Sequence, residues 1–178
     1  EELNKILDAN KLNLSWHLIG KDKLQPILYI DYAQYSSAKD FTQFLIDLLD
    51  TETSVNDRRY EAEMIYDVVG NNNGLPDNFS FACTNGLCLL SPSSMLVEEA
   101  IRVLHSDEGF ADDLAFRKIL NTSGRYVHAN VYLNYKVLNQ LFYPFVDHTR
   151  WNELSWLSQF AQWGELDVDI KNDAIIMN

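Results

Sequence analysis

The residues best placed for chemistry are two cysteines, Cys83 and Cys88, which flank an Asn-Gly pair. Asn-Gly is the preferred centre of a two-residue hairpin turn, because both central positions adopt positive φ. If Asn85 and Gly86 form that turn, the cysteines face each other on a non-hydrogen-bonded rung, with Cα atoms ~4.5 Å apart. This geometry allows two states, a pair of reduced thiols packed as small apolar side chains or a cross-strand disulfide. The C-x4-C spacing, without a second pair, favours neither zinc nor a C-x-x-C redox motif.

Histidines and carboxylates are the other side chains that could bind a metal ion or a ligand. His17 and His128 lie on the polar faces of two expected strands, and pairing of those strands would bring them together as a polar patch or a metal site. Glu165, Asp167 and Asp169 share one face of a further strand, a row typical of a solvated side and also of a loose Ca²⁺ site. Solvent-exposed strand faces explain both patterns, so we assign no metal site.

Sequence patterns of the common enzyme classes are absent. The chain has no G-x-S-x-G turn, no Walker or Rossmann glycine loop and no H-E-x-x-H. We therefore assign no catalytic residue and no cofactor, and the sequence favours a protein that is not an enzyme. Two aromatic residues, Tyr143 and Trp156, fall off the apolar stripes of their expected helices and join His17 and His128 as binding candidates, since exposed aromatics stack on sugars or anchor partner proteins.

The composition indicates an acidic globular chain. Its 178 residues are 47% hydrophobic and 22% charged, which predicts a single folded domain over residues 1–178. The formal net charge of −12 argues against nucleic-acid binding, which requires Lys and Arg to neutralise phosphates, and against contact with an anionic membrane surface.

Hydrophobic periodicity predicts an α+β fold, with a mostly antiparallel sheet built from hairpins and with helices packed on one face. Alternation at period two predicts strands at 12–19, 27–30, 61–69, 126–135, 166–170 and 174–177, and a hairpin over 78–90. Helical spacing and capping residues predict helices that begin near Ser36 or Ser37, at Ser91-Pro92 and at Asp112, and two more at about 136–146 and 149–163. The polar stretch 51–58 is expected to be a loop.

Four segments taken together resemble domain-of-unknown-function family 3352, in its branch from anaerobic gut bacteria. They are SWHLIGKDKLQPILYI (15–30), FSFACTNGLCLLSPSSMLVEEAIRVL (79–104), ANVYLNYKVL (129–138) and FAQWGELDVDIKNDAIIMN (160–178). The resemblance spans most of the chain and implies an envelope protein with a membrane anchor outside this segment, in the periplasm or at the cell surface. It also implies that residues 1–178 are a trimmed N-terminal portion of a longer chain. An oxidising compartment would permit the Cys83–Cys88 bridge.

The expected function is a non-catalytic binding or assembly module of the bacterial cell envelope that engages a protein, a glycan or a lipid. One alternative is a hydrolase-type enzyme whose site is completed by residues outside this segment. The other is a purely structural domain that packs on the rest of its own chain. The sequence predicts no oligomeric state.

Overall fold

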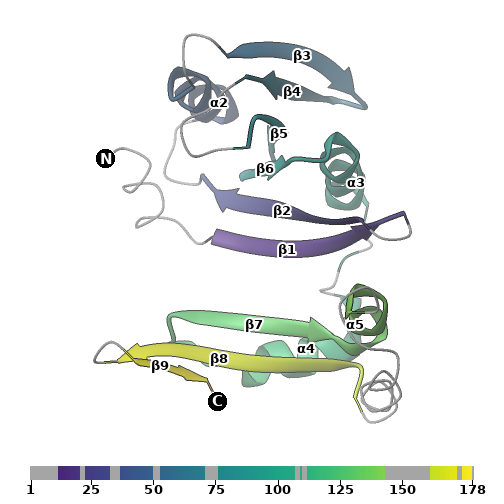
Figure 1. Cartoon of the computed structure of the whole chain (residues 1–178), viewed down its shortest axis with the longest axis vertical. Coiled ribbons are helices and arrows are strands. Elements are labelled where there is room, and N and C mark those ends of the chain that lie inside the picture. The colour runs from purple at the N-terminus through teal and green to yellow at the C-terminus, as the bar shows by residue number, and fades with distance from the viewer. Residues whose placement is uncertain are drawn as a thin grey trace. The chain divides into compact units, whose positions relative to one another are not determined.

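The computed structural model describes residues 12–20, 23–32, 37–49, 53–70, 76–106, 109, 112–142, 161–171 and 174–177. The sequence predicted one domain, whereas the structure divides the chain into two compact units, Glu1–Asp107 and Glu108–Asn178. The division follows the sheets: the described strands form a six-stranded sheet in the first unit and a three-stranded sheet in the second (Figure 1). The predicted α+β class with mostly antiparallel sheet is confirmed.

The first unit is an antiparallel sheet with the strand order β1-β2-β6-β5-β4-β3. Three hairpins build it, which pair β1 with β2, β3 with β4, and β5 with β6. The strands are β1 (Leu12–Ile19), β2 (Lys23–Asp31), β3 (Ser54–Tyr60), β4 (Glu63–Val69), β5 (Asn78–Thr84) and β6 (Leu87–Ser91). The described residues of this unit also form two helices, α2 (Ala38–Asp47) and α3 (Ser94–His105).

Helices α2 and α3 cover opposite faces of the sheet, whereas the sequence predicted helices on one face. Phe41 of α2 packs in a cluster with Phe81 of β5 and Cys88 of β6. On the other face, Ile101 of α3 packs with Leu89 and Ile65. Successive positions of β5 and β6 are buried on both sides of the sheet, and such strands need cover on both faces.

Capping and turn residues in the sequence predict most elements of this unit, but two of the predictions are wrong. Ser37 caps α2 as predicted, because its hydroxyl accepts from the Asp40 backbone N–H at 3.1 Å. The predicted cap at Ser91 is wrong: Ser91 ends β6 and donates to the Pro26 carbonyl at 2.7 Å, while α3 begins after Ser93. The loop predicted at 51–58 is also wrong, because β3 occupies most of it as an edge strand, a position that tolerates polar residues.

The second unit is a small antiparallel sheet with the order β7-β8-β9 and helices beside it. Its elements are α4 (Leu114–Thr122), β7 (Ala129–Asn134), α5 (Tyr135–Phe142), β8 (Trp163–Lys171) and β9 (Ala174–Met177). Asp113, one residue later than predicted, caps α4 by accepting from the backbone N–H groups of Ala115 and Phe116. Within the described ranges, no helix has the length and apolar character needed to cross a membrane.

Candidate functional site

The candidate site is one face of the three-stranded sheet, which we name the aliphatic face. Strand pairing places Val131 opposite Leu166, Val168 opposite Met177, and Ile170 opposite Ile175, and residues that face each other across antiparallel strands share a side of the sheet. The aliphatic face therefore consists of Ala129, Val131, Leu133, Leu166, Val168, Ile170, Ile175 and Met177. It joins three strands into one surface without a charged side chain.

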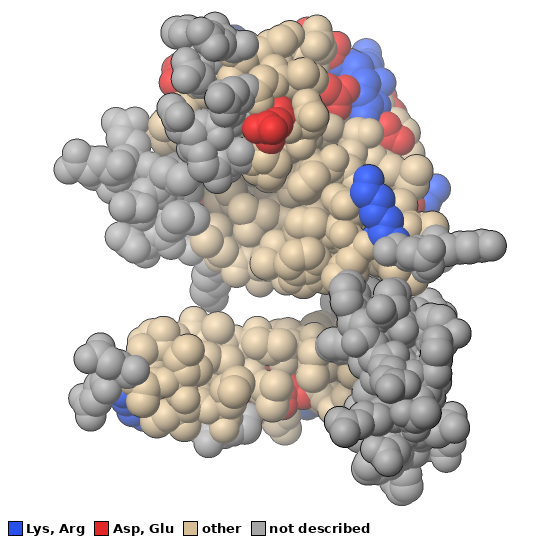
Figure 2. Space-filling model, in the orientation of Figure 1, with Lys and Arg blue, Asp and Glu red and all other residues tan. Residues whose placement is uncertain are grey.

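The aliphatic face is largely exposed in its unit. Ile170, Ile175 and Met177 have 52%, 68% and 66% of their surface accessible to solvent, and Val131 and Leu166 are exposed as well. Figure 2, in the orientation of Figure 1, shows the surface over these strands mostly free of charged side chains. Scattered exposed apolar residues are normal, but contiguous apolar patches are typical of interaction sites.

Helix α4 packs on the opposite face, which we name the covered face. Phe116 of α4 contacts the rings of Tyr132 and Trp163, with centroids 5.4 and 4.9 Å apart. Asp113, at the start of α4, accepts from the Trp163 indole N–H at 3.0 Å and from the Gln162 amide at 2.9 Å. The hydrogen bond from Trp163, followed by those from the Ala115 and Phe116 backbone N–H groups, lowers the pKa of Asp113.

The row of carboxylates predicted at 165–169 lies on the covered face, so the expectation of a solvated side is wrong. Asp167 accepts from the Asn130 amide at 2.7 Å and from the Gly124 backbone N–H at 3.3 Å. A Cβ at Gly124 would lie 2.6 Å from the Asp167 carboxylate, so a side chain at this position would displace that carboxylate. Glu165 is the exception, since its Oε1 is buried without a hydrogen-bond partner in the described part of the chain.

His128 belongs to this polar network. Its Nδ1 lies 2.5 Å from Asp169 Oδ1, and Lys171 Nζ lies 2.6 Å from the other oxygen of the same carboxylate. The Lys171 ammonium, followed by His128, holds the pKa of Asp169 below its ordinary value. His128 therefore serves as a partner of a structural carboxylate rather than as a free binding group.

His17 lies in a second polar cluster, in the first unit. The Ser15 hydroxyl and His17 Nε2 are 2.8 Å apart, and Ser15 also shares a hydrogen bond with Tyr29 of the neighbouring strand. Burial lowers the pKa of His17, although the Glu99 carboxylate acts in the opposite direction. The neutral imidazole is thus able to accept a proton from the serine hydroxyl. A serine beside a base is the minimal arrangement for nucleophilic catalysis.

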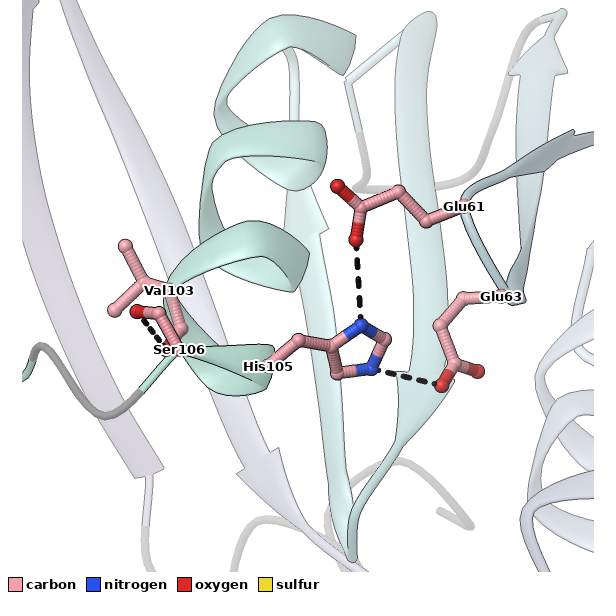
Figure 3. A network of polar contacts seen from close by, with 5 residues as sticks. All are labelled: Glu61, Glu63, Val103, His105 and Ser106. Atoms are coloured by element: carbon pink, nitrogen blue, oxygen red, sulfur yellow. Dashed lines mark hydrogen bonds and ion pairs between the residues drawn. The ribbon is translucent and has the colours of Figure 1, made fainter.

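A third cluster surrounds His105 at the end of α3 (Figure 3). Its Nδ1 lies 3.3 Å from Glu61 Oε2 and its Nε2 lies 3.1 Å from Glu63 Oε1, so the ring stands between two carboxylates of the β3–β4 turn. The cluster ties α3 to the hairpin and was missed at the sequence level, where 44 and 42 residues separate the partners.

The predicted candidates meet different outcomes. The condition for bringing His17 and His128 together is not met, because β1 and β7, the strand that follows His128, belong to different sheets. Tyr143 and Trp156 lie outside the described residues. Cys83 faces Cys88 as predicted, and both thiols are free. In the ranges that the structure describes, no group of three His, Cys, Asp or Glu side chains is arranged to hold a metal ion.

Comparison with known proteins identifies no relative: no family model matches the chain, and no curated protein or solved structure matches it significantly. The resemblance of the four sequence segments therefore stays a prediction.

Proposed function

We propose that this chain is a non-catalytic binding or assembly module, with the aliphatic face of β7–β9 as its binding surface. The observation that carries the proposal is the arrangement of the small sheet, where α4 packs on the polar and aromatic side while the aliphatic side is exposed. Since burial of apolar surface stabilises a complex by about 25 cal/mol per Å², an uncovered face of this kind favours association.

The chemistry of the surface favours a protein as the partner. The exposed members of the aliphatic face (Val131, Leu166, Ile170, Ile175 and Met177) are all aliphatic or thioether side chains, whereas sugars are recognised by stacking on aromatic rings. The formal charge of −12 opposes an anionic lipid surface and favours a partner whose apolar patch has a basic rim. Placement in the cell envelope, in the periplasm or at the cell surface and held by an anchor outside this segment, rests on the resemblance of the sequence segments alone.

Crosslinking followed by a binding measurement tests the proposal. A photoreactive residue at position 175, in cells that express the protein, identifies the partner, and titration calorimetry then measures its affinity in purified form. We expect Ile175→Lys to weaken binding at least tenfold, because a charge would enter an apolar interface. Met95→Lys is the matched control, since Met95 is 62% exposed on α3 and should leave affinity unchanged. Equal affinity of the two variants would overturn the proposal.

The crosslinked product also separates the alternatives. A product confined to one polypeptide would favour a structural domain that packs on the rest of its own chain. A product between two identical chains would replace the heterologous partner with a second copy.

A hydrolase is the second candidate, because of the 2.8 Å contact between Ser15 and His17 Nε2. In such an enzyme Ser15 would attack an acyl group while His17 accepts the hydroxyl proton. A fluorophosphonate probe, which labels activated serines, distinguishes the two functions. Labelling of Ser15 that Ser15→Ala and His17→Ala both abolish would support the hydrolase. An unlabelled native protein, beside a labelled serine-hydrolase control, would contradict the hydrolase.

A further inference from the structure

The end of the β5–β6 hairpin brings two sulfur atoms together. Thr84 pairs with Leu87 across the Asn85-Gly86 turn, and Cys83 faces Cys88 on the next rung. The turn residues have φ of 50° and 83°, the positive values of a type I′ turn. The cysteines therefore occupy a non-hydrogen-bonded rung, where side chains stand closest, and the Cys88 thiol hydrogen-bonds the Cys83 sulfur.

Contacts from other elements hold this end of the hairpin in place. Tyr32 donates its backbone N–H to the Gly86 carbonyl at 3.1 Å, and its hydroxyl accepts from the Gly86 backbone N–H at 3.2 Å. The Thr42 side chain of α2 also hydrogen-bonds Cys83. Little backbone movement is thus needed to bring the two sulfurs to bonding distance.

The two thiols differ in their surroundings. Cys83 is half-buried, while Cys88 is fully buried under α2. The hydrogen bond from Cys88 lowers the pKa of Cys83, whereas burial raises the pKa of Cys88 well above its ordinary value. A thiol that is more accessible and more easily deprotonated reacts first with an oxidant, and a neighbouring thiol then resolves the product.

We propose that Cys83 and Cys88 form a reversible redox site, in which Cys83 is the peroxide-reactive thiol and Cys88 is the resolving thiol. The Cys83 thiolate attacks one oxygen of hydrogen peroxide, the O–O bond breaks, and the leaving hydroxide takes up a proton to become water. Cys83 is then a sulfenic acid. The Cys88 sulfur attacks the Cys83 sulfur, the S–O bond breaks, and the departing hydroxide takes the Cys88 proton. Two thiols lose two electrons in total, and the peroxide is reduced to two waters.

A small oxidant suits this site, because Cys83 is only partly accessible and a bulky disulfide would need to enter the sheet face under α2. The disulfide would close a short loop across a tight turn, and short loops add little entropic stabilisation. The bond would consequently fix the pairing of β5 with β6 without acting as a main support of the fold. The site is independent of the binding function proposed above.

Mass spectrometry of the native protein tests the proposal. Peroxide treatment should lower the mass of the monomer by about 2 Da, block both thiols against alkylation, and be reversed by reductant. In the Cys88→Ser protein the reaction should stop at the sulfenic acid of Cys83, which dimedone traps. In the Cys83→Ser protein Cys88 should stay alkylatable after unfolding and form no dimedone adduct.

The opposite pattern of adducts would overturn the assignment of roles. Oxidation that appears only in urea, or only as disulfide-linked dimers that increase with protein concentration, would overturn the intramolecular site. Near- and far-ultraviolet circular dichroism confirms that each variant is folded. The wild-type experiment is decisive even if a variant fails to fold.

Discussion

The two sheets of this chain differ in whether their apolar faces are covered. In the six-stranded sheet, helices cover both faces and bury apolar clusters that include Phe81 on one side and Ile65 on the other. In the three-stranded sheet, α4 packs on a face that carries Asp167, Asp169 and Tyr132, and the aliphatic face is exposed. Hydrophobicity alone does not decide which face a helix covers. Hydrogen bonds and ring contacts on the polar face can direct the packing.

The polar face of the small sheet can be covered because Asp167 and Asp169 have hydrogen-bond or ion-pair partners, with the Glu165 Oε1 as the exception in the described part of the chain. Burial costs less free energy for carboxylates that accept hydrogen bonds from backbone and side-chain donors than for carboxylates without partners. Asp113 illustrates this, since one carboxylate caps α4 and holds the Trp163 indole. The contrast between the sheets yields three predictions about where substitutions destabilise the protein.

The largest effect is expected in the core of the six-stranded sheet. Phe81 is 1% exposed and stacks on Tyr66 at 5.0 Å, so Phe81→Ala should lower the free energy of unfolding by about 3–5 kcal/mol through lost burial and a cavity. Urea denaturation, followed by hydrogen exchange of the β5–β6 peptides, measures this loss. Tyr126→Ala is the control, because Tyr126 is 99% exposed and its loss should be close to neutral. A similar result for both variants would contradict the assignment of the core.

Local signals in the sequence predict elements in both sheets, but they do not say which face of a sheet a helix covers, for a physical reason. In the first unit the turn at Asn85-Gly86, the cap at Ser37 and the apolar positions of β5 and β6 all act locally, and each leads to the observed element. In β7 the alternation is equally clear, but alternation defines two faces without stating which of them is covered. That choice depends on contacts of Asp113 and Phe116 with residues about 50 positions away.

The polar clusters show the same limit. The expected grouping of His17 with His128 required two strands to pair, and strand order cannot be derived from alternation. Ser15 and His17, by contrast, are two positions apart on one strand, so period two places them on one face. That contact was accessible from the sequence and was missed because no enzyme motif contains it.

An intermediate effect is expected at Asp113, with a defined pH dependence. Its pKa is lowered in the folded protein, so its contribution to stability is complete above the ordinary value of 3.8 and is lost as the pH falls through the folded pKa. Asp113→Ala should lower the urea midpoint of the second unit at pH 7, because the cap and the Trp163 bond are both removed. Asp113→Asn should retain part of the cap and remove this pH dependence.

Hydrogen exchange of the α4 and β8 peptides between pH 2.5 and pH 7 follows the effect of these substitutions. A wild-type protein and an Asp113→Asn protein with the same loss of protection at low pH would contradict the role of this carboxylate. The Asp112→Asn protein provides a matched control, since the exposed Asp112 carboxylate pairs with the exposed Arg117.

The smallest effect on stability, and the sharpest test of the comparison, is expected on the aliphatic face. Ile175 is 68% exposed on the edge strand β9, and edge strands commonly carry Lys, so Ile175→Lys should change the free energy of unfolding by less than ~1 kcal/mol. Trp163→Ala, on the covered face of the same sheet, should cost about 3–5 kcal/mol, because Trp163 is 8% exposed against Phe116. Urea denaturation of both variants measures the difference between their free energies of unfolding.

A large loss in the Ile175→Lys protein, measured without any partner, would show that the aliphatic face is already buried within the isolated protein. The face would then be part of the protein's own core, and the proposed binding surface would be wrong. A small loss combined with the tenfold loss of affinity expected for the same substitution would separate binding from folding at one residue. The six-stranded sheet offers no equivalent substitution in its core, because Ile65 and Phe81 are buried and a charge at either position would act on folding first.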